Sequence, residues 1–391
     1  MPKTKTKTHP IKLDKEKSGV RIIIVGGGFG GITTALELAK KNLSNVAITL
    51  ISDKADFEYK PSLYRLVSDR HAPGVAVRLK DIFAEKNIRI AIDRVKKLDI
   101  KNKKIIGQKK YSFDYLVLAI GSETNFFDIP GLPKRAYPFK SHADALKLKA
   151  RLQKILSAKK RENIVIVGGG PTGVELAGEI AYFARKNESV GIELVERHAR
   201  LLPHLSKNVS RLATRRLEKL GVKILTRRTV VRENAGNIIF RDFGVKTKTV
   251  VWTAGTKNNP FFAKAKLRHG KSRQVTVDNF LQASKSKNIF VIGDSADTDD
   301  VGTAQSAIAH GRLTAENICR KIAGGKLLTR MRHPVAYIIP IGPRWAIACL
   351  GKKAFAGKTG YALRKLADLR FFWRILPKTR FFRLLLAHLG L

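Results

Sequence analysis

A glycine-rich turn occurs twice in this chain, in nearly the same sequence. Residues 22–31 read IIIVGGGFGG and residues 164–173 read IVIVGGGPTG. In each copy an apolar, β-branched run precedes the glycines and a helical pattern follows them, which is the context that makes a G-x-G-x-x-G spacing a dinucleotide-binding motif. The glycines with this spacing are Gly26, Gly28 and Gly31 in the first copy and Gly168, Gly170 and Gly173 in the second. Two such turns predict two dinucleotides bound by one protein.

The second strand of each unit distinguishes the two sites. A carboxylate at the end of this strand binds the ribose hydroxyls of a dinucleotide, and it repels the 2′-phosphate of NADP. The second unit has Glu196 at this position, although Arg197 and Arg200 lie close enough to weaken the repulsion. In the first unit Ser52 aligns with Glu196 and Asp53 follows it, so either residue can make the ribose contact. The second unit is therefore predicted to prefer NAD.

The composition is strongly basic. The 391 residues include 76 Lys and Arg against 31 Asp and Glu, a formal net charge of +45, which favours polyanionic partners such as nucleic acid or an anionic membrane surface. Residues 1–18 are polar and rich in lysine and predict a disordered arm, not a signal peptide. No apolar run reaches the ~20 residues that span a bilayer. Two cysteines are too few for a disulfide framework and indicate a reducing compartment.

Four further segments extend the pattern over most of the chain. They are YKPSLYRL at 59–66, YLVLAIGS at 115–122, VVWTAGT at 250–256 and IFVIGDSAD at 289–297. Together with the glycine turns they resemble the flavoproteins with two dinucleotide-binding domains, and among these the type II NADH dehydrogenases. The resemblance implies FAD and NADH as cofactors. It places Gly121 and Gly255 at crossovers between the domains, and Gly293 and Asp294 at the ribitol chain of FAD.

The resemblance also implies the fold. The expected class is α/β, with two Rossmann-like dinucleotide-binding domains. The FAD-binding domain comprises residues 19–145 and 265–330, and an NAD-binding domain of residues 155–260 is inserted between these parts. A small, membrane-facing C-terminal region of residues 335–391 completes the chain.

The resemblance assigns the chemistry to the cofactors, so no metal is expected. Hydride transfer from NADH to FAD needs correct geometry and electrostatics from the protein and no general acid. The family position near the nicotinamide is occupied by Glu175. From the residues alone, a carboxylate in the first turn of that helix is equally explained by the helix dipole.

The cysteines and the segment at 304–311 indicate the class of electron acceptor. Cys319 and Cys349 do not form a CxxC or CxxxxC pair, and they are predicted to pack as small apolar residues. A quinone is then the natural acceptor. The family segment AQxAxQQG reads AQSAIAHG here, so Gln305 is kept while Ala309 and His310 replace the two glutamines. His310 could donate a proton to the reduced quinone, or it could be a satisfied histidine at the surface or at an interface.

The C-terminus combines basic residues with an apolar helical pattern. The pattern is interrupted at Pro377 and consists of Leu363, Leu366, Leu369, Phe372 or Trp373, Leu376, Phe381, Phe382, Leu385 and Leu389. Between 364 and 383 many Lys and Arg accompany a single acid, Asp368, which is typical of helices lying in a membrane interface. We expect peripheral association with the cytoplasmic face of the cell membrane. The same helices could instead pack on the flavin domain or on a second subunit of a homodimer.

These observations favour an FAD-dependent NADH:quinone oxidoreductase that does not pump protons. One alternative is a basic flavoprotein like apoptosis-inducing factor, with a nucleic-acid-binding or partner-binding role. Another is an NAD(P)H-flavoprotein reductase for a different acceptor. Lys and Arg are spread over the whole chain and no nucleic-acid-binding motif occurs, which favours the enzyme.

Overall fold

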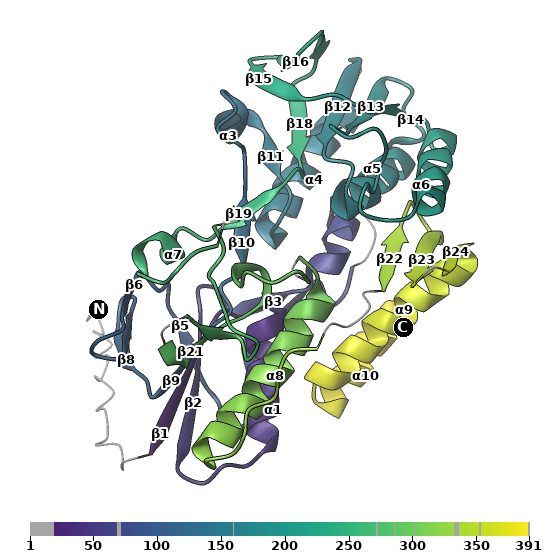
Figure 1. The fold of residues 1–391 in the computed structure, drawn as a ribbon. Helices are drawn as coiled ribbons and strands as arrows, with labels where there is room; N and C mark the ends of the chain where they lie inside the picture. Colours follow the sequence, from purple (N-terminus) through teal and green to yellow (C-terminus); the bar gives the residue numbers. More distant parts are fainter. Residues whose placement is uncertain are drawn as a thin grey trace, which may run out of the picture.

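The computed structural model describes residues 19–68, 72–158, 160–270, 273–284, 286–300, 302–331, 336–351 and 353–389. The basic arm predicted for residues 1–18 lies outside these residues. Figure 1 shows two sheet-and-helix units, one above the other, with the C-terminal strands and helices along one side of both.

The first unit is built on a six-stranded sheet that joins distant parts of the chain. Its strands in spatial order are β20 (Gln282–Ala283), β21 (Ser286–Val291), β9 (Tyr115–Leu118), β1 (Val20–Val25), β2 (Val46–Ser52) and β5 (Arg89–Ile92). All neighbours are parallel except β20 and β21. Helices α1 (Phe29–Lys40) and α8 (Ala304–Ile322) pack against each other beside this sheet. The apolar run of β1 is therefore buried, as expected for a parallel strand covered by helices.

The second unit repeats the arrangement with a five-stranded sheet. Its strands in spatial order are β11 (Tyr137–Pro138), β18 (Thr249–Trp252), β12 (Glu162–Val167), β13 (Val190–Val195) and β14 (Val222–Leu225), all parallel. Its helices are α4 (His142–Ser157), α5 (Pro171–Ala184) and α6 (Lys207–Lys219). The predicted α/β class with two Rossmann-like units is confirmed.

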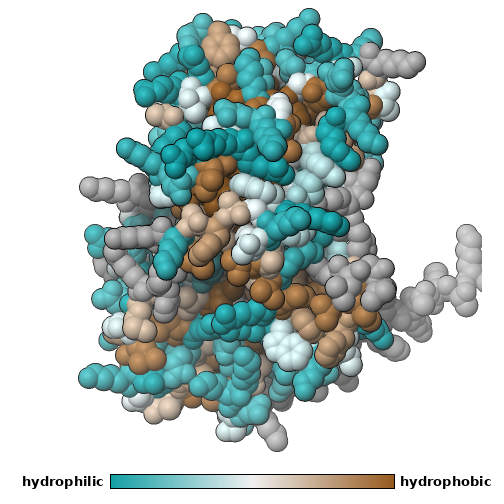
Figure 2. Space-filling view, turned by 90° about the vertical axis from the view of Figure 1, so that its right-hand side faces the viewer, coloured by the Kyte–Doolittle hydropathy of each residue, from teal (hydrophilic) through white to brown (hydrophobic). Residues whose placement is uncertain are grey.

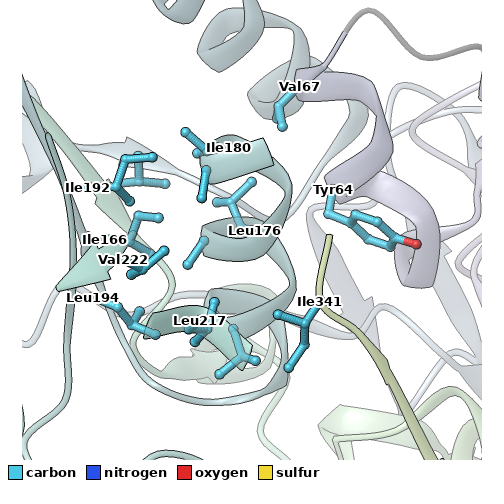
Figure 3. Close-up of a cluster of buried hydrophobic side chains, with 14 of the residues drawn as sticks. Tyr64, Val67, Ile166, Leu176, Ile180, Ile192, Leu194, Leu217, Val222 and Ile341 are labelled. Carbon is cyan, nitrogen blue, oxygen red and sulfur yellow. The ribbon is translucent and has the colours of Figure 1, made fainter. Parts of the chain in front are cut away.

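The core of the second unit includes residues from other parts of the chain. Figure 3 shows Leu176 and Ile180 of α5 facing the apolar side chains of the sheet and of α6. Tyr64 and Val67, from the 3₁₀ helix η1 (Lys60–Val67), and Ile341, from the C-terminal region, belong to the same buried cluster. The two units and the C-terminal region therefore share one apolar interface.

The remaining elements of the two units are short strands and helices. The crossovers pair as antiparallel strands β10 (Ser122–Thr124) and β19 (Thr256–Asn258). The remaining short strands are β3 (Asp56–Glu58), β4 (Ala76–Arg78), β6 (Lys97–Asp99), β7 (Lys104–Ile106), β8 (Lys110–Ser112), β15 (Val230–Asn234), β16 (Asn237–Phe240) and β17 (Gly244–Lys246). The short helices are α2 (Leu79–Ile82), α3 (Leu132–Arg135), α7 (Phe261–Lys264) and η2 (Gly293–Ser295).

The C-terminal region is a three-stranded antiparallel sheet followed by two helices. The elements are β22 (Tyr337–Pro340), β23 (Ala346–Leu350), β24 (Lys353–Gly357), α9 (Lys358–Ile375) and α10 (Lys378–Leu389). Pro377 separates the helices, as the sequence predicts. No helix in the described ranges combines the length and the apolar character needed to cross a bilayer.

A buried ion pair anchors α9 beside the first unit. Asp368 lies 3.0 Å from the Arg364 guanidinium and accepts a 2.7 Å hydrogen bond from the Tyr59 hydroxyl. Arg364 also donates to the carbonyl oxygen of Pro61 at 2.6 Å. Removing one partner of such a buried pair would leave an uncompensated charge.

The predicted apolar stripe of the C-terminus divides between two faces of the helices, which differs from the single membrane-facing stripe that we expected. Phe372, Leu376 and Phe381 are buried in the core of the first unit, so this part follows the packing alternative. Trp373 and Phe382 are 51% and 52% exposed. Helical periodicity alone cannot distinguish the two faces because both are apolar.

The two units both depend on a close approach of strand and helix at the glycine turn, which gives a first prediction. A Cβ atom on Gly173 would overlap the carbonyl oxygen of Gly168, whereas a Cβ atom on Gly170 would meet no atom within 4 Å. Gly173→Ala should therefore lower the free energy of unfolding by about 1–3 kcal/mol, the usual cost of overpacking. The matched control Gly170→Ala should change it by less than about 1 kcal/mol. Urea unfolding followed by fluorescence measures both, and equal effects would contradict the packing argument.

Candidate functional site

A cavity of about 1940 Å³ lies between the two units and extends beside α8 and α9. Its lining combines the first glycine turn, both crossovers, the segment after β21 and the start of α8. The predicted site residues that line it are Gly26, Gly28, Ser52, Asp53, Gly121, Glu175, Gly255, Gly293, Asp294, Gln305 and His310. The second glycine turn contributes only Pro171 and Thr172, so Gly168, Gly170, Gly173 and Glu196 lie outside the lining. Gly31 is also outside the lining, and most of the other predicted site residues meet in this one cavity.

The first glycine turn leaves open space where a phosphate group can approach the backbone. Gly26 has a φ of 115°, and Gly31 lies so close to Gly26 that no side chain fits between them. At Gly28, by contrast, an added Cβ would meet no atom within 4 Å. This combination of a tight turn and an open approach to the N-terminus of α1 is the geometry that binds a pyrophosphate.

Ser52 and Asp53 both remain candidates for the ribose contact beside the first glycine turn. Ser52 is buried beside Gly27, and its Oγ accepts a 3.2 Å hydrogen bond from the backbone N–H of Lys54. Asp53 is exposed at the rim of the cavity. Ser52 thus has the position beside the turn, and Asp53 has the free carboxylate.

The carboxylate of Glu196 is held rigidly beside the second glycine turn. Its Oε2 accepts a 2.8 Å hydrogen bond from the backbone N–H of Gly169. Its Oε1 accepts a 2.8 Å bond from the backbone N–H of His198 and lies 2.6 Å from His198 Nδ1. Arg200 donates to the carbonyl oxygens of Leu202 and Pro203, which occupies one of the two arginines that could attract a 2′-phosphate. The contact with His198 is one that sequence reasoning missed.

Asp294 belongs to a chain of polar groups that the sequence did not reveal. Its Oδ2 accepts a 2.7 Å hydrogen bond from Ser122 Oγ, and Ser122 Oγ accepts a 2.7 Å bond from Lys140 Nζ. Burial, followed by the neighbouring charge of Lys60, lowers the pKa of Lys140 to about 8. No motif marks this lysine, because its contact with Asp294 spans more than 150 positions of the chain.

Glu175 is a titratable group within the cavity. It lies on α5 just after the first turn, not within it as the sequence suggested, and it is half-buried. Burial raises the pKa of Glu175 to about 8, with Arg364 opposing the rise and Asp368 adding to it. At neutral pH this carboxyl group is therefore mostly protonated, and it can hold or release a proton near the operating pH of an enzyme.

Gln305 and His310, both on α8, have different surroundings. The amide of Gln305 donates to the carbonyl oxygen of Ala336 at 2.6 Å and accepts from its N–H at 3.3 Å. His310 is 1% exposed. Its Nδ1 accepts a 3.2 Å hydrogen bond from the Gly293 N–H, and its Nε2 lies 3.3 Å from Asp300. Burial lowers the pKa of His310, which favours the neutral ring. The ring is therefore buried, which differs from the surface or interface histidine that the sequence left open, and among the described residues its Nε2 has no hydrogen-bond partner.

Neither cysteine belongs to the site. Cys349 is buried in the apolar core on β23, and Cys319 is partly buried on α8. Neither is among the residues that line the cavity. Burial raises the pKa of both thiols, which disfavours the reactive thiolate.

Comparisons with known proteins show the family of this chain. Residues 20–311 match the family model described as pyridine nucleotide-disulphide oxidoreductase. The chain is 30% identical over 371 residues to demethylphylloquinone reductase NdbB of Synechocystis sp., covering 89% of this chain and 91% of that protein. It is 25% identical over 382 residues to the type II NADH:quinone oxidoreductase Ndh of Mycobacterium tuberculosis, covering 86% and 81%.

A solved structure shows the same fold over almost the whole chain. The structure of NDH2 from Plasmodium falciparum in complex with NADH superposes with a TM-score of 0.83 at 19% identity, covering 94% of this chain and 97% of that one. The matches confirm the resemblance to type II NADH dehydrogenases, and the chain belongs to the pyridine nucleotide-disulphide oxidoreductase family.

Proposed function

We propose that this protein is an FAD-dependent NADH:quinone oxidoreductase that does not pump protons. The observation that carries the proposal is the single cavity of about 1940 Å³ shared by the first glycine turn, Glu175 of the second unit and Gln305 of α8. Ligand pockets commonly measure ~300–1,000 Å³, so this cavity has room for more than one of the molecules that the reaction brings together. The named activities of the relatives support the same assignment.

Specific residues would hold the two dinucleotides. Gly28 and Gly170 leave the backbone open to a pyrophosphate, and Asp294 has an oxygen available for a ribitol hydroxyl. Glu196 would accept the ribose hydroxyls of NADH. We assign FAD binding to residues 19–145 with 265–330, and NADH binding to residues 155–260. The chemistry that FAD would supply when held by these residues is acceptance of a hydride from NADH and transfer of two electrons to the quinone.

Glu175 and His310 would have different roles in this reaction. Reduction of a quinone to a quinol takes up two protons, and Glu175 is the cavity group placed to hold one of them. It interacts electrostatically with Arg364 and Asp368, which belong to the anchor of α9. His310 supports the N–H of Gly293, one residue before Asp294, and so would act by positioning the flavin segment. Gln305 lies at the start of α8, where the quinone ring would enter.

The role of Glu175 predicts a specific dependence on pH. A proton donor whose pKa is about 8 is protonated below that pH, so NADH oxidation with a short-chain quinone should fall as the pH rises through about 8. Glu175→Gln should remove this fall and lower the turnover by about tenfold or more, within the range that general acids contribute. Steady-state rates with a short-chain quinone, ferricyanide and oxygen test the function and this role together.

The exposed Glu188, near the end of the same unit's α5, provides the control. Glu188→Gln should leave the pH profile unchanged. Activity with ferricyanide but none with any quinone would contradict the proposed acceptor. An unchanged profile in Glu175→Gln would contradict only the role of this carboxyl group.

The environment of Glu196 predicts a preference for NADH. In the proposed NADH site this carboxylate would repel a 2′-phosphate, and Arg200 is bonded to backbone carbonyls. Glu196→Gln should narrow the ratio of the flavin reduction rates with NADH and NADPH by about tenfold, equivalent to ~1.4 kcal/mol. Anaerobic stopped-flow absorbance measures both rates. Glu218→Gln, an exposed change on α6, should leave the ratio unchanged, and equal rates with both nucleotides in the unaltered protein would contradict the assignment.

The exposed face of α9 and α10 supports peripheral binding to an anionic membrane. Figure 2, which looks onto the side where these helices run, shows apolar side chains gathered among hydrophilic ones. Trp373 and Phe382 form an aromatic group with Phe381, with ring centroids 5.0–6.3 Å apart. We call Trp373, Phe382 and the exposed Leu386 the apolar ridge. Aromatic and leucine side chains beside arginines are the composition of an interfacial helix.

Arginines beside the ridge add the charge that such a surface requires. Arg370 and Arg374 of α9 and Arg312 of α8 line the outer part of the cavity. The charges of Arg312 and Arg370, together with burial as the largest cause, lower the pKa of Arg374. Within the described part of the chain, neither Arg370 nor Arg374 forms an ion pair. Their attraction to lipid phosphates at the cytoplasmic face would bring the cavity close to the membrane quinone.

If the apolar ridge binds the membrane, changes to it should weaken membrane binding without affecting the oxidation of NADH by the flavin. Changing Trp373, Phe382 and Leu386 together to Ser should lower sedimentation with anionic vesicles by at least about tenfold, while NADH:ferricyanide activity persists because these side chains are exposed. Ile92 and Val231, exposed apolar residues on β5 and β15, provide control changes to Ser. Full vesicle binding by the triple variant would contradict the proposal. A dimer that dissociates only in that variant would assign the ridge to a homodimer interface instead.

A further inference from the structure

We propose that Lys140 raises the redox potential of the bound flavin, acting as a positioning residue through Ser122 and Asp294 and through its own positive charge. The inference rests on the FAD-binding part of the proposed function and does not depend on the identity of the electron acceptor. No comparison assigns a role to this lysine.

Three separate segments meet at Lys140. Its Nζ donates to Ser122 Oγ on β10 at 2.7 Å, and Ser122 Oγ donates to Asp294 Oδ2 in η2 at 2.7 Å. The second carboxylate oxygen of Asp294 is left to face a ligand in the cavity. The chain Lys140–Ser122–Asp294 therefore fixes the orientation of the carboxylate that would bind the ribitol of FAD.

The backbone around Lys140 is fixed independently of this chain. Ser141 is the N-cap of α4, and its Oγ accepts a 3.1 Å bond from the N–H of Asp144. The Asp144 carboxylate accepts in return from the N–H groups of Ser141 and Lys140, at 2.9 and 3.1 Å. This reciprocal capping box fixes the start of the helix, so the lysine side chain projects from a rigid position.

The charges around Lys140 leave it incompletely compensated. Lys60 of η1 repels it, while Asp294 of η2 and Glu123 of β10 attract it, and all of these residues line the cavity. The carboxylate of Asp144 is engaged by backbone N–H groups. In the described ranges Lys140 makes no direct ion pair; its Nζ bonds to a neutral hydroxyl. A partly buried cation in this state favours any neighbouring group that becomes more negative.

Reduction of the flavin is such a change. Two electrons and one proton add negative charge to the isoalloxazine ring, and a fixed charge near the ring is one of the means by which proteins tune this cofactor. Because burial lowers the pKa of Lys140 to about 8, the cation is present below that pH and is lost above it. The reduced flavin in turn raises this pKa, because it stabilises the protonated lysine.

Three forms of the protein test the inference across pH. The flavin of the wild type, Lys140→Met and Lys140→Arg is equilibrated anaerobically with a reference dye, without NADH or quinone. At pH 6–7 and at the same solution potential, Lys140→Met should lower the ratio of reduced to oxidised flavin about tenfold. This change corresponds to a fall of ~30 mV in the potential of a two-electron couple. Lys140→Arg stays charged at every pH and should follow the wild type there.

The decisive observation is how the wild type changes with pH. Its potential should follow Lys140→Arg below about pH 8 and approach that of Lys140→Met as the pH rises further, while the difference between the potentials of the two variants stays constant. The titration of Glu175 is common to all three forms and cancels in their differences. Lys257→Met removes the same charge from an exposed site on β19, beside β10, and should leave the potential unchanged.

Several outcomes would overturn the inference. Equal potentials in Lys140→Met and Lys140→Arg would show that the charge has no effect. A wild type that stays parallel to Lys140→Arg through pH 9 would show that Lys140 does not titrate near 8. If Lys140→Met releases its flavin, the comparison of the wild type with Lys140→Arg still decides. A protein that binds flavin but reduces no quinone contradicts only the proposed function, whereas one that binds no flavin contradicts both.

Discussion

Each unit of this protein depends on one steric constraint, the contact of the third glycine of the turn with the first. At both Gly31 and Gly173 an added Cβ would overlap the carbonyl oxygen five residues earlier. The helix that follows must therefore start directly at the carboxyl end of its strand, and its N-terminus points into the space beyond the sheet. The first turn lines the cavity between the units, whereas the second turn reaches it only through Pro171 and Thr172 at the start of α5.

The cavity is then completed by contacts between segments that are distant in sequence. Tyr59, Arg364 and Asp368 hold α9 beside η1. The charges of Arg364 and Asp368 in turn act on the pKa of Glu175. Ser122 connects Lys140 to Asp294 on the other side. Arg364 and Asp368 thus both fix the C-terminal helix and modify the pKa of Glu175, which burial raises.

The sequence predicts what depends on local pattern and misses what depends on long-range contact. The glycine turns, the β21 motif and the break at Pro377 each have a local signature, and the structure has strands, turns and helices at these positions. The bonds of His310 and the Lys140–Ser122–Asp294 chain have none, because they join residues of different elements, up to 172 positions apart for Ser122 and Asp294. The C-terminal pattern shows a third kind of difficulty. Trp373 and Phe372 are adjacent and equally apolar, yet one is exposed and the other is buried, which only the packing of α9 decides.

The central claim is that one flavin carries electrons between two substrates that meet in a single cavity. Anaerobic double-mixing stopped flow tests it most directly: NADH is mixed with the flavoprotein, and a short-chain quinone is added once the flavin absorbance has bleached. The account predicts that the absorbance returns in one exponential phase, at a rate no slower than the steady-state turnover with the same quinone. A flavin that stays bleached, or that reoxidises more slowly than turnover, would contradict it.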